Sequence, residues 1–202
     1  MNGDQSSEQR GTVEQVWDEA HQWHKTIKDA IASAEKFALI DSLTGLYNRR
    51  FYNEEIKKAV TSAERGQPLS LILLDIDYFK HKNDRFGHLV GDKVLQQLGN
   101  LIRKNIRGAD IACRYGGDEA IIILPQTRLR DEQDKENGAA KIAERLRSEV
   151  EKKLRVENQP ATVSIGVTEW RKGDNPETLF KRVDVAMYRA KEAGRNQVKA
   201  AD

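Results

Sequence analysis

Four carboxylates stand at the ends of two apolar segments of the sequence, and these residues are the best suited to chemistry. Asp75 and Asp77 follow the run LSLILL, and Asp118 and Glu119 stand in RYGGDEAIIILP. Both apolar segments are short and aliphatic, which is typical of buried strands. Carboxylates gathered at one sheet edge repel each other, and a hard divalent cation relieves that repulsion through oxygen ligands. The pattern predicts a Mg²⁺ site where three or four carboxylates converge.

The two glycines before the second acidic pair need a separate explanation. Glycine lets the backbone adopt positive φ, and it lets a bulky anion approach N–H groups without meeting a Cβ. We therefore expect Gly116 and Gly117 to adopt such φ values and to leave room for a triphosphate. The alternative is an ordinary hairpin turn, in which Asp118 bonds a loop amide. The strand that ends in Asp-Ile-Asp favours the metal site.

The elements that must position these residues alternate between strands and helices. Helices are predicted over about 51–65, 88–106, 134–154 and 176–194, and strands over LSLILLDIDYF, DIACRY, EAIIILP, ATVSIGVTEW and a short segment near 197–199. This order indicates an α+β fold with a ferredoxin-like split βαββαβ core and an antiparallel-dominated central sheet. We expect helices on one face of the sheet and a loop starting at Lys80.

An N-terminal helix precedes this core and carries a heptad pattern. Its apolar positions are Val13, Val16, Ala20, Trp23, Ile27, Ala30, Ala34 and Phe37. A single helix cannot bury such a narrow stripe by itself, so the pattern favours a parallel homodimer over a helix folded back onto the core. We expect a polar tail and dimerising stalk over residues 1–38 and a second domain over 39–202.

Composition excludes several other classes of protein. The chain has 202 residues and a net charge of +2, which gives no electrostatic clamp for long nucleic acid. Its single cysteine, Cys113, excludes a disulfide framework and a cysteine-based zinc site. No apolar run is long enough to span a bilayer, and no signal peptide is visible. We expect a cytoplasmic location; the alternative is the soluble part of a longer, membrane-tethered chain.

Five motifs resemble the GGDEF-domain diguanylate cyclases in their order and approximate spacing. They are DSLTGLYNRR, LLDIDYFKHKNDRFGHLVGD, RYGGDEA, TVSIGV and AMYRAKEAGRN. The resemblance implies a palm-type fold, a dimer, and condensation of two GTP molecules into cyclic di-GMP with release of pyrophosphate. It implies Mg²⁺ or Mn²⁺ as cofactor. A P-loop GTPase is disfavoured because G-x-x-x-x-G-K-[ST] is absent from the sequence.

The resemblance also implies a role for individual residues. Asp118, Glu119 and Lys80 would be catalytic, with Asp118 as the base. The metal ligands would be Asp75, the carbonyl of Ile76, and Asp118. The substrate would contact Phe79, Lys80, Asn83, Asp92, Gly116, Gly117, Lys191 and Arg195, with Asn83 and Asp92 on guanine and the two C-terminal cations on phosphate. Taken alone, Lys80 would be a solvated lysine, and Asp92, Lys191 and Arg195 would be charges that complement helix ends.

Two further features bear on regulation and activity. Arg107 and Asp110 match the RxxD product-inhibition site of the family; the alternative is a simple surface ion pair. Ala120 stands where the family usually has Phe, which leaves a smaller anchor under the turn. A catalytically weakened module that binds cyclic di-GMP or GTP as a sensor is therefore the second hypothesis. A third is another purine cyclase chemistry, including mixed dinucleotides, although Asp92 favours guanine.

Overall fold

The computed structural model describes residues 17, 19, 21–28, 39–130, 138–157 and 159–201. The chain divides between residues 39 and 40 into two units, which are described separately. In the first unit, residues 17, 19 and 21–28 are helical. Trp17, Trp23 and Ile27 expose 63%, 69% and 53% of their surface there. The remaining heptad positions and the polar tail lie outside the described residues, so the predicted stalk stays a prediction.

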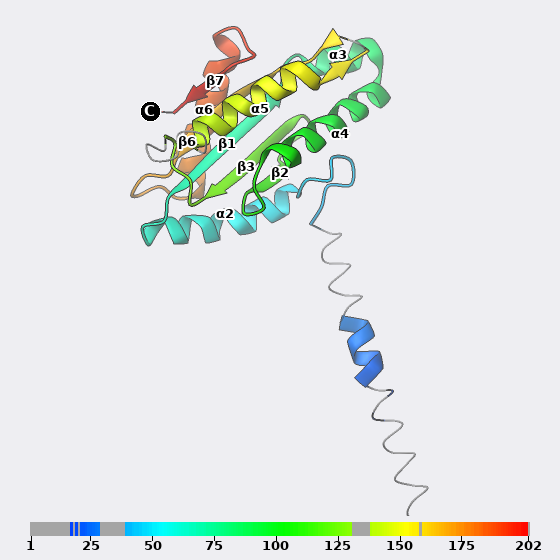
Figure 1. Cartoon of the computed structure of the whole chain (residues 1–202), viewed down its shortest axis with the longest axis vertical. Helices are drawn as coiled ribbons and strands as arrows, with labels where there is room; N and C mark the ends of the chain where they lie inside the picture. The colour runs from blue at the N-terminus through cyan, green and yellow to red at the C-terminus, as the bar shows by residue number, and fades with distance from the viewer. Residues whose placement is uncertain are drawn as a thin grey trace, which may run out of the picture. The chain divides into compact units, whose positions relative to one another are not determined.

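The second unit is a mixed α+β domain, which confirms the predicted fold class (Figure 1). Its helices are α2 (Arg49–Glu64), α3 (Phe79–Phe86), α4 (His88–Asn105), α5 (Ala139–Lys153) and α6 (Pro176–Glu192). Its strands are β1 (Leu69–Ile76), β2 (Ile111–Arg114), β3 (Glu119–Pro125), β4 (Arg155–Val156), β5 (Gln159–Pro160), β6 (Val163–Glu169) and β7 (Val198–Ala200).

The main sheet has the strand order β2-β3-β1-β6-β7. Strand β1 pairs antiparallel with β3 and β6, β2 pairs antiparallel with β3, and β6 and β7 are parallel. The expected antiparallel-dominated sheet is confirmed. Every residue of β1 is buried, as expected for a central strand covered on both faces. The edge strand β2 is itself covered by Tyr47, whose N–H donates to the Ala112 carbonyl and whose carbonyl accepts from the Arg114 N–H.

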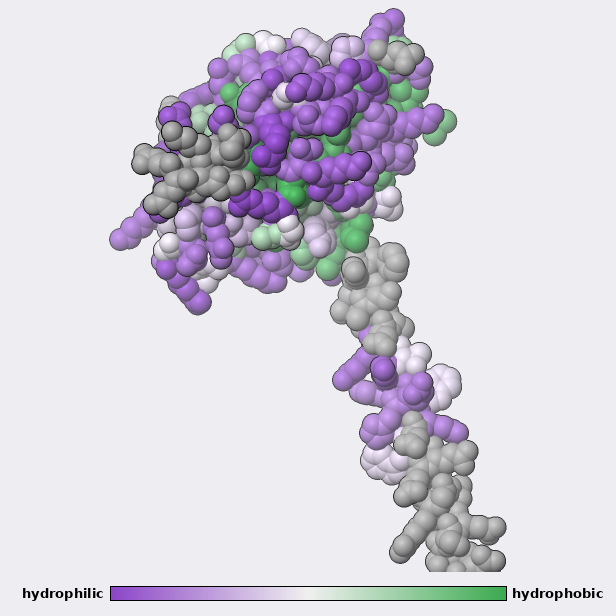
Figure 2. All heavy atoms as spheres, in the orientation of Figure 1, coloured by the Kyte–Doolittle hydropathy of each residue, from purple (hydrophilic) through white to green (hydrophobic). Residues whose placement is uncertain are grey.

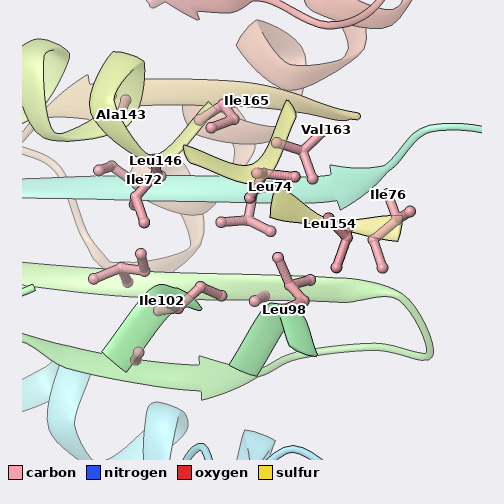
Figure 3. Packing of buried hydrophobic residues seen from close by; sticks show 14 of the residues in the cluster. Ile72, Leu74, Ile76, Leu98, Ile102, Ala143, Leu146, Leu154, Val163 and Ile165 are labelled. Atoms are coloured by element: carbon pink, nitrogen blue, oxygen red, sulfur yellow. The ribbon is translucent and has the colours of Figure 1, made fainter. Parts of the chain in front are cut away.

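Helices cover both faces of the sheet, so the expectation of helices on one face is wrong. Ile72, Leu74 and Ile76 pack against residues of α4 and α5, as Figure 3 shows. The alternate residues of β1, together with α2 and α6, form a second hydrophobic cluster. Figure 1 shows α4 and α5 on the sheet face nearer the viewer. The physical reason is that β1 is apolar at both alternations, so each face needs a cover.

The segment after β1 is the helix α3, so the prediction of a loop at Lys80 is wrong. Tyr78 precedes the helix in the left-handed region, with φ 58°, and Gly87 ends it with φ 85°. Within the helix only Phe79 is buried. A short, polar helix gives almost no apolar periodicity, which is why the sequence pattern did not reveal it.

The outer surface shown in Figure 2 is predominantly hydrophilic over the second unit. In the part of the chain that the structure describes, no helix is both long and apolar enough to cross a bilayer.

Candidate active site

The ends of β1 and β3 bring the predicted acidic residues to one place. Asp75 pairs in register with Glu119 on β3, and Asp118 directly precedes that strand. Helix α6 supplies Lys191 from its last turn, and Lys191 Nζ lies 2.9 Å from Asp75 Oδ2. Opposed residues of an antiparallel pair place their side chains on the same face. The strand register therefore accounts for the grouping of Asp75, Asp118 and Glu119.

These carboxylates are poorly neutralised. Asp75 is only 8% exposed. Burial, with the charges of Asp118 and Glu119 adding to it, raises its pKa to about 6, against the opposing effect of Lys191. Burial also raises the pKa of Glu119, with Asp118 and Asp184 adding to the effect and Lys191 and Arg49 opposing it. Such partly compensated carboxylates are common at functional sites.

Asp77 does not join this group, which corrects the expectation that it would. It is 1% exposed, and its carboxylate accepts hydrogen bonds from Thr162 Oγ1 and Ser164 Oγ, both at 2.6 Å. The backbone N–H of Asn196 donates to the same carboxylate at 3.1 Å. Three donors satisfy this buried carboxylate, so its role is structural.

The arrangement fits a metal ion only if waters and substrate phosphates supply part of its coordination. Within the described ranges, Asp75, Asp118 and Glu119 lie near one another, but no group of three or more His, Cys, Asp or Glu side chains is placed to hold one ion by itself. Mg²⁺ is usually held by one or two carboxylates together with waters and substrate phosphates. Asp75 and Asp118, with their incompletely compensated negative charge, match that donor set.

The signature glycines differ from the expectation in their backbone conformation. Neither Gly116 nor Gly117 has positive φ, so that prediction is wrong. A Cβ on Gly116 would lie 2.6 Å from Glu119 Oε2, the far end of a flexible side chain, so the Glu119 carboxylate would have to shift to admit it. A Cβ on Gly117 would meet nothing within 4 Å, and the residue is exposed. Ala120 is buried opposite Leu74 and carries no ligand atom.

Sequence reasoning missed the residues that hold this turn. Arg114 donates from Nη2 and Nε to the Gly117 carbonyl at 2.8 and 3.3 Å, and from Nη1 to Asp41 Oδ2 at 3.1 Å. Burial acts to raise the pKa of Asp41, but hydrogen bonds from Thr44 and the charge of Arg114 leave it lowered. Both residues belong to quoted motifs. Their pairing across 73 positions has no local signal in the sequence.

The residues predicted to bind phosphate through their side chains or N–H groups lie at the start of α3, in the last turn of α6 and just after α6. Phe79 and the exposed Lys80 form the first turn of α3. Arg195 Nη1 donates to the phenol oxygen of Tyr78 at 3.0 Å, and its guanidinium carbon lies 4.2 Å from the centre of that ring. Tyr78 immediately precedes α3, so the structure brings Arg195 to the same helix end as Lys80.

The two residues predicted to read guanine are also neighbours. A Cβ on Gly91 would lie 1.9 Å from Asn83 Oδ1, so Asn83 packs directly against the backbone next to Asp92. The Asn83 Oδ1 atom is buried and has no hydrogen-bond partner in the described part of the chain. A buried acceptor without a donor is costly, and a ligand N–H would satisfy it.

Arg107 and Asp110 lie in one tight turn that backbone hydrogen bonds hold. The backbone N–H of Arg107 donates to Asp110 Oδ2 at 2.8 Å, and the Asp110 N–H donates to the Arg107 carbonyl at 3.0 Å. Burial raises the pKa of Asp110. Both residues line a pocket of about 350 Å³, which also includes Tyr47 and Arg103. Arg103 was not among the predicted residues.

Comparisons with known proteins agree with this geometry. The family described as "Diguanylate cyclase, GGDEF domain" matches residues 38–197. The chain is 42% identical over 176 residues to the response regulator PleD of Caulobacter vibrioides, covering 81% of this chain and 36% of PleD. It is 40% identical over 179 residues to the diguanylate cyclase VdcA of Vibrio cholerae, covering 85% of this chain and 50% of VdcA.

A solved structure is similar over almost the whole chain. The crystal structure of the coiled coil and GGDEF domain of DgcB from Caulobacter crescentus, in complex with c-di-GMP, has a TM-score of 0.82 and 29% identity. The alignment covers 94% of this chain and 100% of that one. The chain therefore belongs to the GGDEF domain family. It spans only about a third to a half of the length of PleD and VdcA.

Proposed function

We propose that this chain is a diguanylate cyclase, which condenses two GTP molecules into cyclic di-GMP and releases two pyrophosphates. The observation that carries the proposal is the buried carboxylate of Asp75, set opposite Glu119 and beside Lys191 at an open glycine turn. Family membership and the names of relatives such as VdcA support it.

The reaction forms one phosphodiester bond at a time. The 3′-oxygen of one GTP attacks the α-phosphorus of the other, and the bond from that phosphorus to the β-phosphate oxygen breaks. Asp118 accepts the proton of the attacking 3′-hydroxyl. Repetition with the roles exchanged closes the ring. Each chain holds one GTP, so two copies must face each other across a twofold axis.

The acidic residues would hold the metal. Asp75, the carbonyl of Ile76, and Asp118 are the proposed ligands, with Glu119 completing the negative cluster. When bound, Mg²⁺ or Mn²⁺ lowers the pKa of the attacking hydroxyl and stabilises charge on the leaving pyrophosphate. Lys80 adds positive charge close to the transferred phosphoryl group.

The phosphates and the guanine base would be bound by residues of α3, α4, α6 and the turns beside them. The backbone N–H groups of Phe79 and Lys80 would donate to phosphate, and Lys191 and Arg195 would bind the terminal phosphates. Gly116 and Gly117 would contact this group at the turn, where a Cβ on Gly117 would meet nothing within 4 Å. Asn83 and Asp92 would read the guanine edge: the unpaired Asn83 Oδ1 accepts an N–H, and a carboxylate accepts from N1–H and the exocyclic amine.

The dimer is proposed to form through the N-terminal helix. Trp23 and Ile27 are four residues apart and strongly exposed, so they offer an apolar stripe to a second copy. The DgcB structure is described as including a coiled coil, which supports this arrangement. We accordingly propose residues 1–38 as the dimerising stalk and 39–202 as the cyclase domain, in a cytoplasmic setting that supplies GTP.

Product inhibition is proposed at the turn of Arg107 and Asp110. The pocket beside this turn is lined by Arg103 as well, and two guanidinium groups suit a guanine edge or a phosphate. Arg107→Ala should raise the concentration of cyclic di-GMP that halves the initial rate by about tenfold or more. An unchanged value would remove this part of the proposal.

The decisive experiment is incubation with GTP and Mg²⁺, followed by chromatography of the nucleotides. A single cyclic dinucleotide and pyrophosphate are the expected products. Tight binding of cyclic di-GMP without any turnover, even in Arg107→Ala, would instead favour the sensor hypothesis. That hypothesis comes from Ala120, which stands where the family usually has Phe. A mixed dinucleotide in the presence of ATP would favour the broader purine cyclase hypothesis.

A further inference from the structure

Two strained turns meet beside the start of α3. Tyr78 has φ 58°, and the residues after α6, Arg195 and Asn196, have φ 64° and 44°. Positive φ is uncommon for residues other than glycine, so each turn needs contacts that hold it. The buried Asp77 supplies one, because its carboxylate accepts from the Asn196 N–H. This bond ties the turn after α6 to the residue preceding Tyr78.

The second tie is between side chains. One N–H of Arg195 donates to the phenol oxygen of Tyr78, and the guanidinium lies over the aromatic ring at 4.2 Å. A guanidinium has five N–H donors, so this contact leaves others available in its plane. The ring contact and the hydrogen bond to the phenol oxygen together restrict the position of the guanidinium.

We propose that Tyr78 is a positioning residue, which holds the guanidinium of Arg195 ready for the terminal phosphates of a nucleoside triphosphate. The inference rests on the proposed function, because it deepens the role given there to Arg195. A long arginine side chain loses rotamer freedom when it binds a ligand, and a side chain that is already ordered loses less. Tyr78 thus contributes to affinity without touching the nucleotide.

The alternative is that the contact only stabilises the two turns. The two roles differ in which ligand they affect. A positioning role acts only on ligands that carry terminal phosphates. A purely structural role acts through α3, which also carries Asn83, and so alters the binding of every guanine nucleotide alike.

The test measures the dissociation constants of 3′-deoxy-GTP and of GMP, with Mg²⁺, for the full chain. 3′-Deoxy-GTP lacks the attacking hydroxyl, so no condensation disturbs the measurement. Tyr78→Leu should weaken binding of 3′-deoxy-GTP by about 3- to 10-fold and that of GMP by less than about 2-fold. Tyr78→Phe keeps the ring and loses the hydroxyl, so an effect of roughly 2- to 3-fold is expected. Thermal unfolding checks that both variants are folded, and Tyr78→Phe carries the test if Tyr78→Leu is not.

Two further variants complete the design. Arg195→Ala should weaken 3′-deoxy-GTP binding at least as much as Tyr78→Leu, and the double variant should be no weaker than Arg195→Ala alone. Phe86→Leu is the matched control, because it removes the ring under Arg85 in the same helix, with Arg85 Cζ 4.9 Å from the ring centre. Phe86→Leu should change the affinities for both nucleotides by the same factor.

Three results would overturn the inference. Equal losses for 3′-deoxy-GTP and GMP in the Tyr78 variants, or additive losses in the double variant, would reject positioning while leaving the proposed cyclase intact. A wild-type chain that binds no 3′-deoxy-GTP would reject the proposed function and this inference together.

Discussion

Asp75 and Asp77 lie two residues apart at the end of β1, yet their carboxylates have opposite surroundings. Asp77 is the more deeply buried, at 1% against 8%, and it accepts three hydrogen bonds from Thr162, Ser164 and Asn196. Asp75 has an ion pair with Lys191, and burial together with two acidic neighbours raises its pKa. Burial alone therefore does not mark a functional carboxylate. An incomplete set of donors does, because it leaves negative charge for a ligand to compensate.

The largest expected effect is on catalytic activity, in the acidic group around Asp75. Asp118→Asn should lower formation of the cyclic dinucleotide by roughly 10³-fold or more, because it removes the proton acceptor and a proposed metal ligand. GTP binding and the free energy of unfolding should change little. Chromatography of products and a nucleotide-binding titration measure the two effects. Glu64→Gln, an exposed change at the far end of α2, is the control. Near-normal turnover in Asp118→Asn would show that the site assignment is wrong.

The next prediction concerns the contribution of Asp77, with its three hydrogen-bond donors, to the stability of the fold. Asp77→Ala should lower the free energy of unfolding by about 2–4 kcal/mol, because a buried hydroxyl, a partly buried hydroxyl and a backbone N–H lose their acceptor. Urea denaturation measures this loss. Asp75→Asn is the comparison and should cost much less, since it removes one ion pair but also two like-charge repulsions. If both variants were destabilised equally, the contrast between the two aspartates would disappear.

The pH dependence of stability should follow Asp75. Its pKa is raised from 3.8 to about 6 in the folded chain, so the folded state holds this proton more tightly than the unfolded state. The free energy of unfolding of metal-free protein should therefore fall as the pH rises from about 4 to about 6, by up to about 2–3 kcal/mol. Asp75→Asn should lose this component. Parallel pH profiles for the two proteins would assign the slope to other carboxylates, such as Glu119.

The smallest effect is expected at the turn between β2 and β3, which Arg114 holds. Arg114→Gln should lower kcat/KM by about 3- to 10-fold, because the Gly117 carbonyl and Asp41 lose a shared partner. Asp41→Asn should do less, and the two changes together should not be additive. Lys153→Gln, which breaks an exposed ion pair with Glu149, is the control. Additive effects would mean that the pair does not act as a unit.

The sequence predicted the fold class and the approach of Asp75 to Glu119 better than it predicted φ values and hydrogen-bond partners. Apolar runs and the register of motifs were enough for the α+β class, for the central position of β1, and for the approach of Asp75 to Glu119. The structural role of Asp77 was not predictable, since the hydrogen-bond donors to its carboxylate come from residues more than 80 positions away. The positive φ expected at Gly116 was wrong, because a Gly-Gly pair fits a turn without specifying the φ values that the turn adopts. Local pattern reports which residues are buried, whereas hydrogen-bond partners depend on tertiary contacts.

The bridge formed by Tyr47 along β2 has a consequence for self-association. A sheet usually invites unwanted growth at its open margins, where unpaired backbone groups can recruit a strand from another chain. Here Tyr47 occupies the outer backbone groups next to Cys113 on one margin, and β7 at the other margin spans only Val198–Ala200. In the described part of the domain, neither edge of the sheet presents a long unpaired strand. This disfavours the addition of strands from other chains, as in amyloid-like stacking.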